Sequence, residues 1–221
     1  MKNVFISCLF FTIAACATHP VDLSKEINAA AESEILKTEP KAISERPETA
    51  LSLEKKLELT FDKSDRLVLI NGNRSPAKVI SFKTDEAPLL VIASVIKSAG
   101  WRKDALVVPK ISFYKDGQSV KAPKIKQMGV DSWCGMMVCA VTAYDLKTLP
   151  KGNYKALLAA YVERPEQPLE FRKVSGMYYA GAVPLFISAE RAQYASYYGE
   201  VKVNLAKELP FKPSRKDVQT F

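Results

Sequence analysis

The chain has very little histidine: its single residue of this type is His19, close to the N-terminus. Histidine is the usual general base at neutral pH, so histidine-activated serine or cysteine chemistry is excluded from the rest of the chain. The sequence also contains no Gly-x-Ser-x-Gly elbow, no phosphate-binding glycine loop and no dinucleotide-binding fingerprint. Serine–lysine pairs and paired carboxylates stay open, because no spacing singles one out. These absences predict a protein that is not an enzyme.

Cysteine is also scarce, with Cys8, Cys16, Cys134 and Cys139 as the whole set. In an oxidising compartment, Cys134 and Cys139 are expected to form a disulfide. A redox-active pair is the less favoured alternative, because the spacing is not Cys-x-x-Cys. Two thiols and the distant His19 do not complete the four ligands of a zinc site, so no metal is expected.

The sequence lacks an apolar run long enough to span a bilayer, which takes roughly 20 residues. A shorter apolar run lies at the N-terminus, from Val4 to Ile13. Lys2 precedes this run, and Ala14 and Ala15 lead directly into Cys16. A positive start, a short apolar segment and small residues indicate an export signal rather than a transmembrane anchor. The cysteine after the small pair makes the segment similar to a bacterial lipoprotein signal. The resemblance implies that residues 1–15 are removed and that Cys16 carries a covalent lipid. No other cofactor is expected.

The residue after the lipid-bearing cysteine points to a location. It is Ala17, whereas aspartate at this position is the usual signal for retention at the inner membrane of Gram-negative bacteria. The resemblance therefore implies a protein anchored in the outer membrane through its lipid and facing the periplasm.

The chain is basic, with a formal net charge of +8; residues 16–50 have a net charge of −3, so the basic charge lies in residues 51–221. A basic body can indicate nucleic acid as a partner. Here the lysines are scattered, and no basic run is interleaved with aromatic residues, so no nucleic acid is expected. An ordinary solvated surface is the favoured interpretation. Attraction to anionic envelope material, such as lipopolysaccharide phosphates, is the alternative.

Composition divides the mature chain into three parts. Residues 16–50 are rich in Ala, Glu, Ser, Lys and Pro, which predicts a flexible tether with at most a transient helix from Asp22 to Leu36. Pro40 and Pro47 are expected to stop any continuation of that helix. Residues 51–210 are expected to form the folded domain, and residues 211–221 a basic tail.

The folded domain shows short β-branched runs, with a turn between most of them. The expected strands are Leu57–Phe61, Arg66–Ile70, Val79–Phe82, Leu89–Ile96, Leu106–Tyr114, Val138–Tyr144, Tyr154–Val162 and Glu200–Leu205. Asn71-Gly72 and Asp116-Gly117 are strong hairpin signals. Together these features predict an all-β fold, an antiparallel β-sandwich.

A change of character after Arg164 predicts a helical or irregular insertion near the C-terminal end of the domain. Val174 to Ile187 contains Gly176, Gly181 and Pro184, which favour an irregular packed loop. Ala189 to Tyr198 is expected to form a short helix, with Ser188 as its N-cap.

The second half of the chain is unusually rich in tyrosine, tryptophan and methionine. These large amphipathic rings suit sugar and protein contacts, although core packing is the favoured alternative for most of them. The two tyrosine doublets are the best contact candidates, because adjacent residues in an extended chain point in opposite directions. The candidate contact residues are Trp133, Tyr178, Tyr179, Tyr197 and Tyr198.

Several segments resemble the maltose-operon periplasmic protein family. They include Leu57-Glu-Leu-Thr-Phe61, Ile80-Ser-Phe82, Pro88-Leu-Leu-Val91, the run from Val108 to Gly117, and Gly199-Glu-Val-Lys-Val203. The resemblance implies a non-enzymatic envelope protein that serves carbohydrate uptake, with an oligosaccharide or an uptake protein as its partner. It supplies no motif of binding residues.

A second hypothesis rests on the tether, the basic body and the missing catalytic motifs. In this interpretation the protein is a structural scaffold lipoprotein of an envelope assembly or secretion complex. Both hypotheses expect another envelope protein as a partner.

Overall fold

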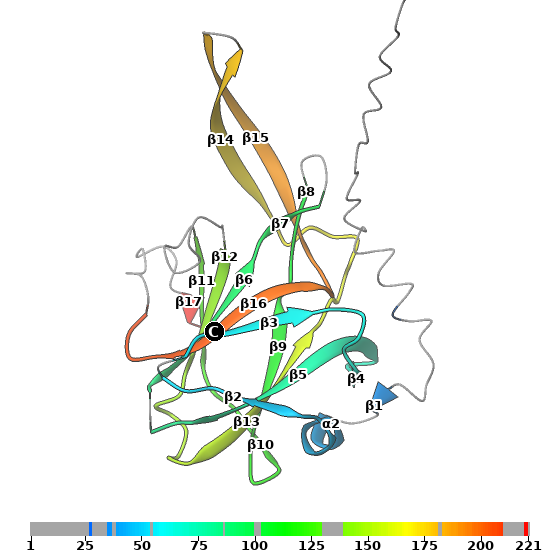
Figure 1. The fold of residues 1–221 in the computed structure, drawn as a ribbon, viewed down its shortest axis with the longest axis vertical. Helices are drawn as coiled ribbons and strands as arrows, with labels where there is room; N and C mark the ends of the chain where they lie inside the picture. Colours follow the sequence, from blue (N-terminus) through cyan, green and yellow to red (C-terminus); the bar gives the residue numbers. More distant parts are fainter. Residues whose placement is uncertain are drawn as a thin grey trace, which may run out of the picture.

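The computed structural model describes residues 27, 35–36, 39–53, 55–85, 87–99, 103–129, 139–180, 183–209 and 219–220. These residues are mostly β-strand and are arranged in three sheets, as Figure 1 shows. Nearly all neighbouring strands within the two larger sheets are antiparallel, which confirms the predicted all-β class.

The larger sheet has seven strands, all of them between residues 35 and 160. In spatial order the strands are β1 (Ile35–Leu36), β4 (Leu67–Ile70), β5 (Asn73–Lys83), β13 (Asn153–Ala160), β9 (Pro109–Lys115) and β10 (Gln118–Val120). The seventh strand, β2 (Glu48–Ala50), pairs in parallel with the second half of β5.

The second sheet has six strands. In spatial order they are β17 (Gln219–Thr220), β11 (Lys124–Gly129), β12 (Cys139–Asp145), β6 (Leu89–Val95), β16 (Gly199–Ala206) and β3 (Leu57–Phe61). Every residue of β6 is buried, as its continuous apolar run predicts for a strand covered on both faces.

The two sheets face each other across one hydrophobic core. Alternate residues of each strand point into it, because successive side chains lie on opposite faces of a sheet. Phe82 and Phe113 from the larger sheet meet Tyr144 from the smaller one, with the Phe113 and Tyr144 rings 5.3 Å apart and steeply inclined. This shared core makes the body a β-sandwich.

Both predicted hairpin turns are present. Asn71 and Gly72 have φ angles of 50° and 82° and join β4 to β5. Asp116 and Gly117, with φ angles of 51° and 78°, join β9 to β10. Two consecutive positive φ angles are the geometry in which Asn-Gly and Asp-Gly match the twist of paired strands.

The tether prediction is wrong for residues 39–50, which belong to the folded body. They form α2 (Glu39–Glu45) and β2, and the buried Ala42 and Ile43 pack on the outer face of the larger sheet. Pro40 lies in the first turn of α2, where a proline needs no hydrogen-bond acceptor, so it does not stop this helix. The domain therefore begins before the predicted boundary at residue 51.

The predicted helical or irregular insertion is also wrong. This region forms two long antiparallel strands, β14 (Glu170–Ala180) and β15 (Val183–Ala195), so neither the irregular loop nor the helix capped by Ser188 exists. They belong to a third sheet of order β14-β15-β8-β7, which includes β8 (Lys103–Leu106) and β7 (Lys97–Ser98).

The expected strand from Leu106 to Tyr114 is likewise divided. Its first residue, Leu106, is the last residue of β8 in the third sheet, whereas β9 begins at Pro109 in the larger sheet. Buried Val107 lies between them, and its Cγ2 atom would lie 3.1 Å from a Cβ added at Gly199. Because glycine has no Cβ, Gly199 allows Val107 to approach this closely, and it also adopts a φ angle of 153°.

Ionisation of Tyr144 is expected to lower the free energy of unfolding at alkaline pH. Burial raises the pKa of Tyr144 from 10.0 to about 12, so its neutral form is favoured in the folded state. This contribution is complete below pH 10 and is lost as the pH rises through 12. We expect Tyr144 to add up to about 1.4 kcal/mol per pH unit to the loss of stability in that window. Urea unfolding of wild type and Tyr144→Phe across this range measures it, and equal slopes would contradict it.

Candidate functional site

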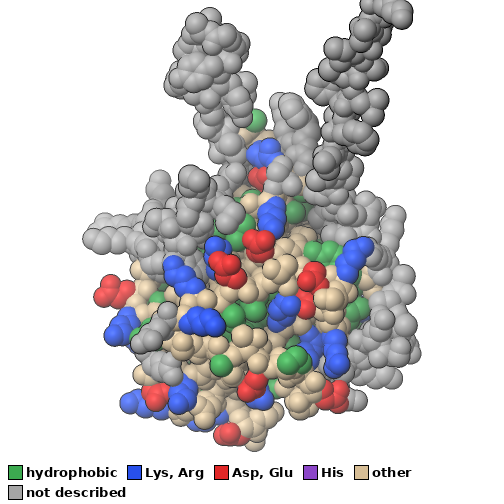
Figure 2. All heavy atoms as spheres, viewed as in Figure 1, with side chains coloured by type: hydrophobic (Ala, Val, Ile, Leu, Met, Phe, Trp, Pro, Cys, Tyr) green, Lys and Arg blue, Asp and Glu red, His purple; other side chains and the backbone are tan. Residues whose placement is uncertain are grey.

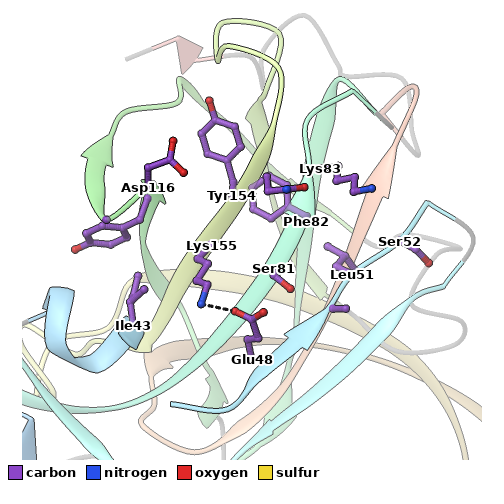
Figure 3. A pocket seen from close by; sticks show the side chains of 14 residues that line it. Ile43, Glu48, Leu51, Ser52, Ser81, Phe82, Lys83, Asp116, Tyr154 and Lys155 are labelled. Atoms are coloured by element: carbon purple, nitrogen blue, oxygen red, sulfur yellow. Dashed lines mark ion pairs between the residues drawn. The ribbon is translucent and has the colours of Figure 1, made fainter. Parts of the chain in front are cut away.

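A groove of about 580 Å³ lies on the outer side of the larger sheet (Figure 3). It is bordered by β2, by one end of β5 and of β13, and by the turn between β9 and β10. Its lining residues are Ile43, Glu48, Ala50, Leu51, Ser52, Ser81, Phe82, Lys83, Tyr114, Asp116, Gly117, Asn153, Tyr154 and Lys155. This volume lies within the range of small-ligand sites.

An ion pair and a phenol hydrogen bond fix the groove wall on the side of α2 and β2. Lys155 Nζ lies 2.6 Å from Glu48 Oε2, and both side chains are partly exposed. The Tyr114 hydroxyl donates to Glu39 Oε2 at 2.9 Å. Burial raises the pKa of Tyr114 well above its usual value, and the Glu39 carboxylate raises it further, so this phenol stays a donor.

The aromatic rings at the groove are not available to a ligand. Phe82, Tyr114 and Tyr154 are only 4%, 5% and 1% exposed. Phe82 and Tyr154 stack on each other within the core, with ring centroids 6.0 Å apart. The groove thus offers hydroxyl, amide and charged groups, whereas none of its described rings provides a surface for stacking on a sugar.

The second feature is the arm, which we define as β14 and β15. Figure 1 shows it extending away from the sandwich. Its strands pair from Glu170 opposite Gln193 to Ala180 opposite Val183. Only residues 192–195 of β15 also pair with β8, so the rest of the arm is two strands wide within the described residues. No charged residue occurs from 174 to 189.

A polar cluster at the base of the arm joins β15 to β8. Arg191 of β15 binds Asp104 of β8: its Nε and Nη2 atoms lie 2.8 and 2.7 Å from Asp104 Oδ1. Nη2 also donates to the Lys103 carbonyl at 2.7 Å. Asp104 is 3% exposed, and Gln193, its partner in the strand register, is 1% exposed. The arm is therefore held by charged hydrogen bonds at its base.

The structure separates the predicted contact residues. Tyr178 and Tyr179 lie on β14, in the outer half of the arm. Tyr197 is buried against Leu67 and Val162, so core packing, the alternative interpretation, applies to it, and Tyr198 packs partly buried beside this cluster. Trp133 lies outside the described residues.

The lipid and disulfide predictions remain untested. Cys16 and Cys134 lie outside the described residues. Cys139 is 1% exposed at the start of β12, opposite Val95 of β6. Its pairing with Cys134 therefore stays a prediction.

Two buried charged residues were missed by sequence analysis. Arg46 donates through Nη1 to the Ala77 carbonyl and through Nη2 to the Arg66 carbonyl at 2.6 Å. Asp104 is the second, in the cluster described above. Neither residue belongs to a recognisable motif. The only sequence feature that could have indicated their burial is that each is a charged residue close to short apolar runs.

The visible face of the body carries acidic and basic side chains side by side (Figure 2). Ion pairs formed by β16 of the second sheet also mix the two signs of charge: Lys97 with Glu200 at 2.9 Å, and Lys202 with Glu58 at 3.0 Å. On this face the arrangement favours an ordinary solvated surface over a patch for anionic material.

The described residues contain no group of three or more His, Cys, Asp or Glu side chains arranged to hold a metal ion. Within the same residues, no helix is both long and apolar enough to cross a membrane. No protein-family model, curated protein or solved structure matches the chain. Membership of the maltose-operon periplasmic protein family thus stays a prediction.

Proposed function

We propose that the protein is a non-enzymatic scaffold lipoprotein of the bacterial envelope, which assembles with another envelope protein through its arm. The observation that carries this proposal is a two-stranded arm that extends from the sandwich and lacks charge from residue 174 to 189. The lipid on Cys16 anchors the chain in the outer membrane, with the body facing the periplasm.

The arm is poorly suited to stand alone in water. An isolated two-stranded hairpin is at best marginally stable, and three or more strands or a packed face are needed for independent stability. At its base the arm gains support from β8 and from the Asp104–Arg191 pair. Its outer half is uncharged and pairs with no other described strand, which supports a role in binding a protein partner.

Site-specific crosslinking tests this function. A photoreactive residue is placed at Tyr179 on the arm of the full-length protein in its native envelope. The matched control carries it at exposed Ser119 on β10. We expect a discrete adduct with one envelope protein from position 179, identified by mass spectrometry, and none from position 119.

The anchor is tested in parallel. Cys16→Ser should move the protein from the membrane fraction to the soluble fraction and remove the lipid mass from its N-terminal peptide. Retention of an unlipidated chain in the membrane would refute the anchor. Absence of any heterologous adduct from the arm would refute the scaffold.

Oligosaccharide binding during carbohydrate uptake is the second candidate function. The groove supports it through its volume and its hydrogen-bonding groups, among them Ser81, Asp116 and Asn153. The buried rings of the groove argue against tight stacking of a sugar. Titration with maltose-type oligosaccharides should give a heat of binding that Asn153→Ala removes. No heat at millimolar ligand would exclude this function.

A further inference from the structure

We propose that two copies of this chain pair through the free edge of β14, so that their arms form one four-stranded sheet. The pairing goes beyond the scaffold function and does not require any other envelope protein.

β14 is the longest strand that lies at the end of a sheet within the described residues. Among the described strands it ends the order of its sheet and is 11 residues long, whereas β3, the next longest strand at the end of a sheet, has 5 residues. β3 also carries Glu58, which pairs with Lys202 on the neighbouring strand. The part of β15 that does not pair with β8, residues 183–191, forms the other open edge of the arm, and it contains Pro184, Glu190 and Arg191. Natural proteins protect such edges with charges, proline or short length. From residue 174 to 180, β14 has neither charge nor proline.

The position of Pro184 shows which backbone groups of β14 face outward. Pro184 lies opposite Tyr179 and has no N–H group to donate across the hairpin. Opposite residues in an antiparallel pair alternate between hydrogen-bonded and non-hydrogen-bonded pairs. Tyr179 with Pro184 is therefore a non-hydrogen-bonded pair, and so is Met177 with Phe186, two residues further along. The N–H and C=O groups of Met177 and Tyr179 consequently point to the free edge.

A second copy fits this edge by symmetry. An antiparallel pairing centred on Met177 places Val174 opposite Ala180 and Ser175 opposite Tyr179 of the other copy. About six hydrogen bonds then form between outward-facing residues. Lys173 lies beyond this uncharged stretch, so no like charges face each other. A two-fold axis of this kind gives a closed dimer.

The shape of the molecule agrees with this pairing. The arm extends away from the sandwich in Figure 1, so two antiparallel arms place the two bodies at opposite ends of the shared sheet. Each arm changes from two strands to part of a four-stranded sheet, which exceeds the three strands that a sheet needs to be independently stable.

Proline substitutions on the two edges of the arm test the pairing. Met177→Pro removes an outward N–H from the β14 edge, and Phe186→Pro removes one from the opposite edge, at the facing residue of the same pair. Two full-length copies with different affinity tags are co-expressed and purified from mild detergent. We expect wild-type and Phe186→Pro copies to co-purify, and Met177→Pro to reduce co-purification at least tenfold.

A cysteine at the centre of the proposed pairing gives a second measurement that does not depend on tolerance of proline. Met177→Cys should form a disulfide-linked dimer in the envelope, whereas Phe186→Cys should stay monomeric. Wild-type copies that fail to co-purify, or equal losses in both proline variants, would overturn the pairing. A dimer without heterologous adducts would refute the scaffold alone, and heterologous adducts without a dimer would refute the pairing alone.

Discussion

Asp104→Ala is expected to lower the free energy of unfolding by about 2 kcal/mol, the scale for losing a hydrogen bond between charged groups at a partly buried site. The substitution leaves the Arg191 guanidinium at the base of the arm without the carboxylate at 2.7–2.8 Å. Asp104 is only 3% exposed, whereas the Arg191 side chain is 23% exposed, so water can solvate the remaining guanidinium only in part. Urea unfolding of the full-length protein measures the change.

Glu200→Ala is the matched control for this prediction. It breaks the ion pair with Lys97, in which the side chains are 52% and 40% exposed. Surface pairs of this kind contribute about 0.2–1 kcal/mol, so this variant should stay close to wild type. Equal effects of the two substitutions would show that the Asp104–Arg191 pair does not hold the arm.

Arg46→Met is expected to release residues 39–50 from the larger sheet. Arg46 is 8% exposed and donates to two backbone carbonyls, those of Ala77 and Arg66. Burial lowers the pKa of Arg46 to about 10, an effect that Asp65 partly offsets, so the guanidinium stays charged at neutral pH. Methionine keeps the apolar stem but loses both donors, at a cost of about 3 kcal/mol.

Hydrogen exchange locates this effect. Amides of residues 39–50 should exchange faster in Arg46→Met, whereas amides of β6 should keep their protection. Lys83→Met, which removes an exposed cation from β5, serves as the control and should leave residues 39–50 protected. Unchanged exchange in Arg46→Met would show that the apolar contacts of Ala42 and Ile43 are sufficient to hold the segment.

Local signals were enough to predict the sandwich. Asn71-Gly72 and Asp116-Gly117 require positive φ angles that few other residue pairs adopt, so the sequence itself specifies those turns. The continuous apolar run of β6 has only one favourable place, between two packed layers. In both cases the signal lies within a few adjacent residues.

Tertiary context decided the elements that the sequence did not reveal. Gly176 and Pro184 are breakers in most settings, yet in the arm Pro184 occupies a non-hydrogen-bonded position that tolerates it. Helix α2 is too short to be stable alone, and it forms because Ala42 and Ile43 pack on the larger sheet. Neither effect can be inferred from local composition.

The role of the candidate contact residues stays a prediction, and the structure shows only where some of them lie. Tyr178 and Tyr179 were singled out by their doublet, and they do lie on the arm, although a loop was expected there. The groove could not be predicted, because it brings together residues of α2, β2, β5, β13 and the β9–β10 turn. Its formation depends on the unforeseen docking of residues 39–50.

The parallel pairing of β2 with β5 has a mechanical consequence. The chain that leads from the proposed anchor at Cys16 joins the body first through β1, which pairs in parallel with β4, and then through residues 39–50, so tension between membrane and body is carried by these segments. In a parallel pair, a pull along the strand loads its hydrogen bonds in shear, all at once, rather than opening them one by one. Arg46, which lies between α2 and β2 and donates to the carbonyls of Ala77 and Arg66, shares that load.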